Sequence, residues 1–250
     1  FYVLLFVGMV LFSRIALMLP ETAKNLSPWR LSTLRNGFTK VVQDPNLLGH
    51  SAMIGLGLGI CFAFFAEAPF YFIQTLGMTP SWFGVVCAAG AVVYGVGCRV
   101  ANRFIQSGTE YTLIMRVGVM LMMSSFSLFV IAVMLFTGSQ TIMQLSNPSL
   151  CVLFTFFWMF SQLGLSFVLT PSFALALENQ AEAAGVAASW FSFIYNMMNM
   201  LICALMAFLH NASLLTMPVY FLVISMCMAV VLRLALDKKW LDAHNVAKYS

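Results

Sequence analysis

The stretch Gly55–Gln74, GLGLGICFAFFAEAPFYFIQ, sets a single acid, Glu67, inside an otherwise apolar segment. The residues that share its helical face are Gly55, Gly59, Ala63, Tyr71 and Gln74. Faces of small residues pack against other helices rather than lipid. Since a carboxylate in hydrocarbon costs at least ~2.5–3.5 kcal/mol, we expect Glu67 to point into protein or a water-filled cavity. Two alternatives stay open: a hydrogen bond that only joins helices, or an acid that reaches the outer interface.

The composition excludes a water-soluble fold. Of the 250 residues, 62% are hydrophobic and 8% are charged, and the mean hydropathy is +0.94. A soluble domain carries roughly 25% charged residues. Spans must be helical, because the alternation of barrel strands is absent and backbone polar groups cannot stay unpaired in lipid.

The sequence therefore predicts an all-α integral membrane protein with seven transmembrane helices. Each predicted span is an apolar run of roughly the ~18 or more residues that cross a bilayer. The predicted spans are residues 1–19, 51–73, 83–100, 113–136, 150–169, 183–209 and 214–236. Measured from residue 51, Glu67 lies in the outer part of its span.

The basic residues orient these spans. All twelve lie at or in alternate connections: Arg14, Lys24, Arg30, Arg35, Lys40, Arg99, Arg103, Arg116, Arg233, Lys238, Lys239 and Lys248. The other connections, residues 75–82, 137–149 and 210–213, carry no Lys or Arg. Because positive loops stay inside, we expect a cytoplasmic C-terminus.

The long first connection has two interpretations. Between residues 21 and 48, apolar residues recur at helical spacing with Arg30, Arg35 and Lys40 between them. This pattern fits a basic amphipathic helix on the inner leaflet, and a solvated basic loop fits it as well. Pro45 and Gly49 are expected to mark the entry to the second span.

Polar residues inside two later spans are candidate cavity residues. In the fifth span Gln162, Ser166 and Thr170 follow at steps of four, and Pro171 is expected to kink or end the helix. The sixth span carries a small or polar stripe at steps of 4, 3, 4, 3 and 4: Gly185, Ser189, Ser192, Asn196, Asn199 and Cys203. The stripe faces either a cavity or a neighbouring helix, where such bonds give only ~0.6 kcal/mol on average.

Other signals are few. Arg99, Asn102 and Arg103, at the inner end of the third span, are candidate loop or gating residues, and Asn102 and Arg103 are expected to pair with carbonyls or acids of the next loop. The phosphate-binding and hydrolase motifs G-x-x-x-x-G-K-S/T, H-E-x-x-H and G-x-S-x-G do not occur. The three His are far apart and the six Cys form no C-x-x-C, so we expect neither a metal site nor an enzyme.

Several short segments, taken in order, resemble the major facilitator superfamily, and most closely its Bcr/CflA-type drug–proton antiporters. The segments are LPET at 19–22, QDPNLLG at 43–49, AEAPFY at 66–71, WFG at 82–84, NRF at 102–104 and AGVAAS at 184–189. The resemblance implies that the seven spans are helices 6–12 of a twelve-helix transporter. The first residue is Phe1, within an apolar run, so we interpret the chain as a fragment.

The resemblance also implies a domain organisation. Residues 1–19 would be the last helix of the N-terminal half, and 20–50 the cytoplasmic central loop. Residues 51–236 would be the C-terminal six-helix bundle, and 237–250 a cytoplasmic tail. The partners would be a small-molecule substrate, the lipid bilayer and the other half of the transporter. No nucleic acid and no cofactor other than a coupling proton would be involved, and the location would be a bacterial inner membrane.

The leading hypothesis is a proton-coupled exporter of small amphipathic or cationic compounds that works by alternating access. We expect its cavity to be lined by Glu67, Tyr71, Gln74, Gln162, Asn196 and Asn199. In the resembling branch a small residue usually stands at the Glu67 position and the main proton carriers lie in the first five helices. Glu67 is therefore expected to be an accessory or substrate-selective acid. A seven-helix receptor and an importer of a small metabolite are the alternatives.

Overall fold

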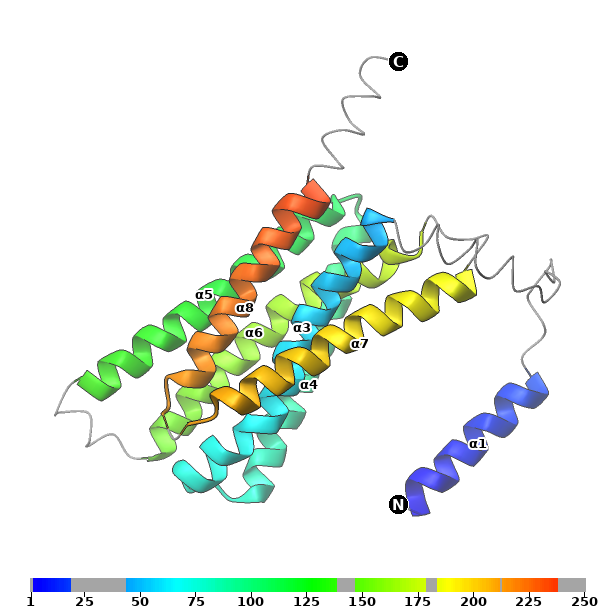
Figure 1. The fold of residues 1–250 in the computed structure, drawn as a ribbon. Helices are drawn as coiled ribbons and strands as arrows, with labels where there is room; N and C mark the ends of the chain where they lie inside the picture. The colour runs from blue at the N-terminus through cyan, green and yellow to red at the C-terminus, as the bar shows by residue number, and fades with distance from the viewer. Residues whose placement is uncertain (1, 19–43, 139–146, 179–183, 212, 238–250) are drawn as a thin grey trace. The chain divides into compact units, whose positions relative to one another are not determined.

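The computed structural model describes residues 2–18, 44–138, 147–178, 184–211 and 213–237, and all the regular structure in them is helical (Figure 1). The elements are α1 (Tyr2–Met18), α3 (Pro45–Pro69), η1 (Phe70–Thr75), α4 (Pro80–Gln106), α5 (Tyr111–Gly138), α6 (Asn147–Ala176), α7 (Ala184–Leu209), α8 (Thr216–Val231) and η4 (Leu232–Asp237). The α-helices match the seven predicted spans. Six of the seven helical segments are long and apolar enough to cross a membrane.

The first helix, α1, belongs to a unit separate from the rest of the chain. It is a 17-residue apolar helix with no buried residue. The predicted amphipathic helix after it falls on residues 19–43, outside the described residues.

The second span begins earlier than predicted. Asp44 is the N-cap of α3, and one of its carboxylate oxygens accepts a 2.9 Å hydrogen bond from the Asn46 N–H. Pro45 occupies the first turn, where its missing N–H costs nothing. The last six residues of the predicted loop of residues 20–50 are therefore part of α3. Gly49 is a buried residue inside the helix and does not mark its entry.

Of the two outcomes expected at Pro171, a kink or the end of the helix, the end is wrong, because α6 continues through Pro171 to Ala176. In membrane helices, side-chain hydroxyls and packed neighbours compensate backbone groups near a proline. The carbonyl that Pro171 leaves without its helical donor is that of Phe167. The neighbouring Ser172 hydroxyl donates to the Val168 carbonyl at 2.7 Å, in a fully buried part of the helix.

Helices α3–α5 and α6–α8 form two three-helix repeats, in which α3 corresponds to α6, α4 to α7 and α5 to α8. The first helix of each repeat packs against helices of the other repeat. Helix α3 packs along α7, and its counterpart α6 packs along α4. Helix α5 packs on α6, and its counterpart α8 packs on α3. The remaining principal contacts, α3 with α6 and α5 with α8, join counterparts to each other. Because consecutive spans alternate in direction, the repeats are inverted, an arrangement that places α3 and α6 at the centre.

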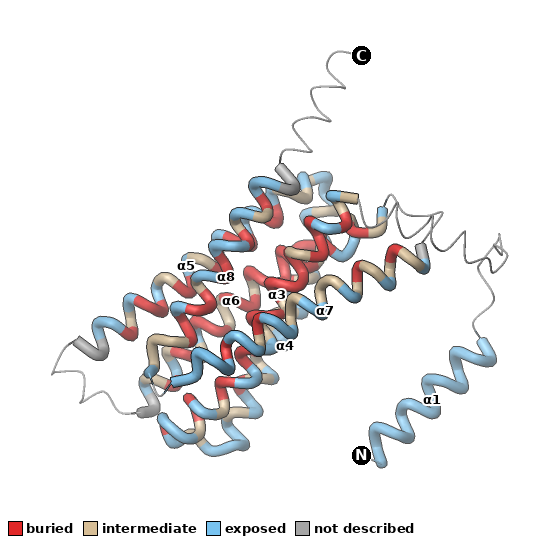
Figure 2. Tube along the Cα trace, in the orientation of Figure 1, coloured by how far each residue is buried: buried red, intermediate tan, exposed pale blue. Residues whose placement is uncertain are grey.

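The burial of the six helices agrees with this arrangement (Figure 2). The central α3 and α6 have most of their apolar length buried, whereas α4 and α7 are largely exposed. The core is rich in aromatic rings. Phe64 of α3 stacks on Trp158 of α6 with ring centroids 3.4 Å apart.

Glycines allow the closest helix contacts. A Cβ at Gly118 of α5 would lie 2.6 Å from the Gly164 carbonyl oxygen of α6. On the third span, Gly90 packs against the Trp158 side chain of α6 and Gly97 against that of Ser166. Space around Gly84 is open to beyond 4 Å.

Gly118→Ala should therefore destabilise the bundle, because the methyl group meets backbone that cannot rotate away. The expected loss is about 1–3 kcal/mol, as in other overpacked cores. Gly84→Ala makes the same change in open space and is the matched control, with a neutral or favourable effect from helix propensity. Thermal unfolding in detergent measures both, and equal midpoints would contradict the α5–α6 contact.

Candidate functional site

Glu67 lies near the outer end of α3 and is paired with a histidine. Its Oε2 is 2.6 Å from Nδ1 of His210, the residue that follows the last residue of α7. This distance is that of a short hydrogen bond to a carboxylate. Glu67 is 5% exposed, whereas 43% of the His210 side chain is exposed. The acid thus points into protein, as predicted, and its partner connects it to the surface.

The small-residue face of α3 explains how these two groups meet. A Cβ at Gly55 would lie 2.8 Å from the Met198 Cβ, and one at Gly59 would lie 2.4 Å from the Ile202 side chain. Helices α3 and α7 therefore run side by side in the same direction. Their outer ends reach the same level, which brings His210 to Glu67.

A second bond joins the same two segments. Pro69 is followed by the π-helical turn η1, and the Tyr71 hydroxyl donates to the Ser213 carbonyl at 2.9 Å. Tyr71 is buried, with 4% of its surface exposed. The turn between α7 and α8 is thus held to the end of α3 at two points, His210 and Ser213.

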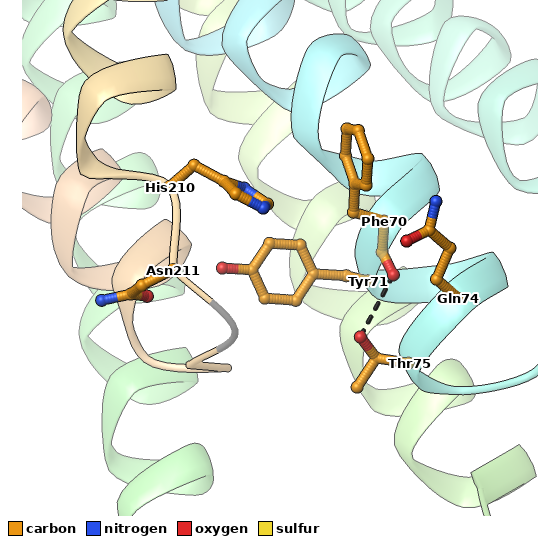
Figure 3. Close-up of a pocket in the computed structure, with 6 residues that line it drawn as sticks. All are labelled: Phe70, Tyr71, Gln74, Thr75, His210 and Asn211. Atoms are coloured by element: carbon orange, nitrogen blue, oxygen red, sulfur yellow. Dashed lines mark hydrogen bonds between the residues drawn. The ribbon is translucent and has the colours of Figure 1, made fainter.

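A pocket of about 110 Å³ opens beside His210, the partner of Glu67 (Figure 3). Its lining residues are Phe70, Tyr71, Gln74, Thr75, His210 and Asn211. The Thr75 hydroxyl is used locally, since it donates to the Phe70 carbonyl at 3.1 Å. The lining combines aromatic faces with side-chain amides and contains no Lys or Arg. Two predicted site residues, Tyr71 and Gln74, lie here, and Glu67 lies behind His210.

Gln162 belongs to a different cluster on α6. It is 5% exposed and lies beside the Cys61 thiol of α3, and a Cβ at Gly90 of α4 would lie 3.8 Å from its Cγ. One turn earlier, the buried Trp158 indole N–H has no hydrogen-bond acceptor among the described residues. Gln162 thus joins three helices in the centre of the bundle and is separate from the outer pocket.

Asn196 and Asn199 lie on an accessible face of α7. Asn196 is exposed and donates to the Ser192 carbonyl at 2.8 Å, one turn back. The Asn199 Oδ1 accepts a 3.5 Å hydrogen bond from the Cys203 thiol. Both amides are therefore bonded within their own helix. The described contacts do not bring them to Glu67, whose side-chain partner is His210.

The predicted loop residues Arg99, Asn102 and Arg103 are exposed near the end of α4. The Arg103 carbonyl accepts from the Ser107 N–H at 3.0 Å, which closes the helix. Within the described part of the chain, neither arginine forms an ion pair. The expected pairing of Asn102 and Arg103 with the following loop remains a prediction.

Sequence reasoning missed His210. It appeared as one of three scattered histidines near membrane boundaries. A signal was present, because it is the only residue able to carry positive charge in the three connections without Lys or Arg. Only the contact between α3 and α7, however, identifies its partner.

Two transporters are similar to this chain over most of its length. An uncharacterized transporter of Rickettsia bellii is 25% identical over 228 residues, which cover 89% of this chain and 54% of the relative. The uncharacterized MFS-type transporter YdgK of Bacillus subtilis is 25% identical over 191 residues, or 76% of this chain and 44% of the relative. The chain is a distant relative of MFS-type transporters. Neither name singles out the drug–proton antiporter branch.

This chain spans about half the length of both relatives. No protein-family model matches the chain, and no solved structure matches it significantly.

Tyr71→Phe tests the second link at the site. The variant loses the bond to the Ser213 carbonyl, and the expected cost is about 0.5–1.5 kcal/mol with faster amide exchange in residues 213–216. Tyr111→Phe is the matched control, because the described residues offer its hydroxyl no acceptor. Chemical unfolding and hydrogen exchange in detergent measure the difference. An unchanged exchange rate at 213–216 would show that Tyr71 does not hold the turn.

Proposed function

We propose that the chain is the C-terminal half of a proton-coupled secondary transporter that exports small amphipathic or cationic compounds by alternating access. The observation that carries this proposal is the pair of inverted three-helix repeats, in a chain related to MFS-type transporters. In such folds the substrate site lies near the midplane, between repeats. Here the two central helices each carry a buried polar side chain, Glu67 on α3 and Gln162 on α6.

The proposed roles follow from the two clusters. Gln162, beside Cys61 and close to Gly90, supplies an amide in the centre of the bundle where a substrate would be oriented. Glu67 and His210 supply exchangeable charge at the outer end. A carboxylate that has one hydrogen-bonded partner can exchange it for a proton or a substrate cation. The small and polar stripe of α7, which includes Asn196 and Asn199, would face the rest of the transporter.

The organisation of the whole protein is part of the proposal. Residues 1–19 would be the last helix of the other half, followed by a cytoplasmic loop to Asp44. Residues 45–237 would form the C-terminal bundle, and the end of the chain a cytoplasmic tail. The additional length of both relatives leaves room for the other half. The protein would lie in a bacterial inner membrane with its basic connections inside.

The similarity to transporters favours this proposal over a seven-helix receptor. An importer on the same fold differs only in the direction of net flux, since fold does not determine function. Direction is therefore an outcome of the transport assay.

Glu67→Gln in the full-length transporter should reduce pH-driven efflux of a cationic dye such as ethidium by about tenfold, the loss expected when a hydrogen bond to a charged group is removed. A neutral substrate should be affected less, because it does not need the carboxylate charge. Everted vesicles with an imposed proton gradient provide the measurement, and reversing the gradient reports direction.

Glu110→Gln is the matched control, since Glu110 is an exposed acid in the α4–α5 connection at the opposite end of the bundle. Its efflux should equal that of the wild type. If the Glu67 variant transports both substrates at the wild-type rate, Glu67 has no part in the mechanism.

A further inference from the structure

We propose that the outer pocket is a binding site for a small organic ammonium ion, which takes the place of His210 beside the Glu67 carboxylate. The proposal deepens the transport function above and rests on it. It assigns a ligand class to the pocket and an exchangeable, internal counter-ion role to His210.

The first step concerns the carboxylate. A buried carboxylate needs a partner, because removing one member of a buried ion pair leaves an uncompensated charge. The Glu67 side chain bonds His210 at 2.6 Å and interacts electrostatically with the nearby Tyr71 hydroxyl. A ligand that replaces His210 must therefore bring a donor, and preferably a positive charge.

The second step concerns the pocket lining. Phe70 and Tyr71 offer aromatic faces, to which cations are attracted. Gln74 and Asn211 add side-chain amide groups, and the lining contains no permanent positive charge that would hold an anion. A volume of about 110 Å³ suits a small ion such as methylammonium or tetramethylammonium.

The third step concerns His210 itself. Its side chain is 43% exposed and it lies beyond the last residue of α7, so the ring can leave without disrupting a helix. It also packs against Phe70, with ring centroids 5.2 Å apart. The imidazole thus occupies the position between an aromatic face and a carboxylate that an ammonium ligand would take. Figure 3 shows this ring at the pocket, between the α7–α8 turn and Phe70.

This arrangement distinguishes an exchangeable counter-ion from a structural clamp. If His210 competes with the ligand, the apparent affinity is reduced by the fraction of molecules in which His210 occupies Glu67. A substitution of His210 that weakens its bond to Glu67 should then strengthen ligand binding. If the pair only holds the site together, weakening it from either side should impair binding.

The test is calorimetric titration of tetramethylammonium and methylammonium into the complete protein in lipid nanodiscs. Glu67→Gln should weaken both ligands by about tenfold or more, the loss expected for a hydrogen bond to a charged group. His210→Asn keeps a neutral donor near the position of Nδ1 but cannot become a cation, and should bind both ligands more tightly than wild type. Glu110→Gln is the control and should bind as wild type.

Phe70→Leu gives a readout that does not depend on the ion pair. Phe70 is 42% exposed, so the variant should fold, and its affinity for tetramethylammonium should fall about two- to fivefold through loss of the cation–π contact. Wild-type affinity in either Glu67→Gln or Phe70→Leu, or equal losses in Glu67→Gln and His210→Asn, would overturn the proposal. Binding with this pattern but without efflux would instead refute the transport function and leave the site intact.

Discussion

The parallel contact between α3 and α7 is the constraint on which the outer site depends. Two glycines, Gly55 and Gly59, let the helices approach so closely that added methyl groups would collide with α7. At that separation, the ends of both helices meet at one level. A carboxylate in an apolar bundle is tolerated only with a partner, and this contact delivers His210 as the partner of Glu67.

The packing of each central helix, α3 or α6, against the other repeat explains why these two helices can carry the buried side chains of Glu67 and Gln162. Each is the first helix of its repeat, and each packs mainly against the three helices of the other repeat. A helix surrounded in this way has little surface for lipid. Polar side chains such as Gln162 and Glu67 can therefore be bonded by neighbouring helices, whereas α4 and α7 present more of their surface outward.

The two repeats are not equivalent in chemistry. The α3–α7 pair ends in an acid and a histidine, while the α4–α6 pair carries Gly90, Gly97 and the Trp158–Gln162 segment near its middle. The acid–histidine pair therefore lies at the outer end and the Gln162 amide in the centre, while a further buried histidine, His50, lies at the inner end of α3. In the proposed transporter, this separation would let charge be exchanged at the outer surface, away from the amide of Gln162.

The sequence by itself determined the helical membrane class, the positions of the spans and the small-residue face of Glu67, because hydropathy and helical period are local properties. It also indicated that Glu67, Tyr71 and Gln74 share one region. The cap at Asp44 followed by Pro45 is a local signal that the predicted start of the span did not use, whereas the local expectation of a helix end at Pro171 is wrong. Only the tertiary structure decided that Glu67 meets His210, that Gln162 lies apart, and that Asn196 and Asn199 bond within α7. The reason is that 143 residues separate Glu67 from His210, and no local pattern specifies which helices become neighbours.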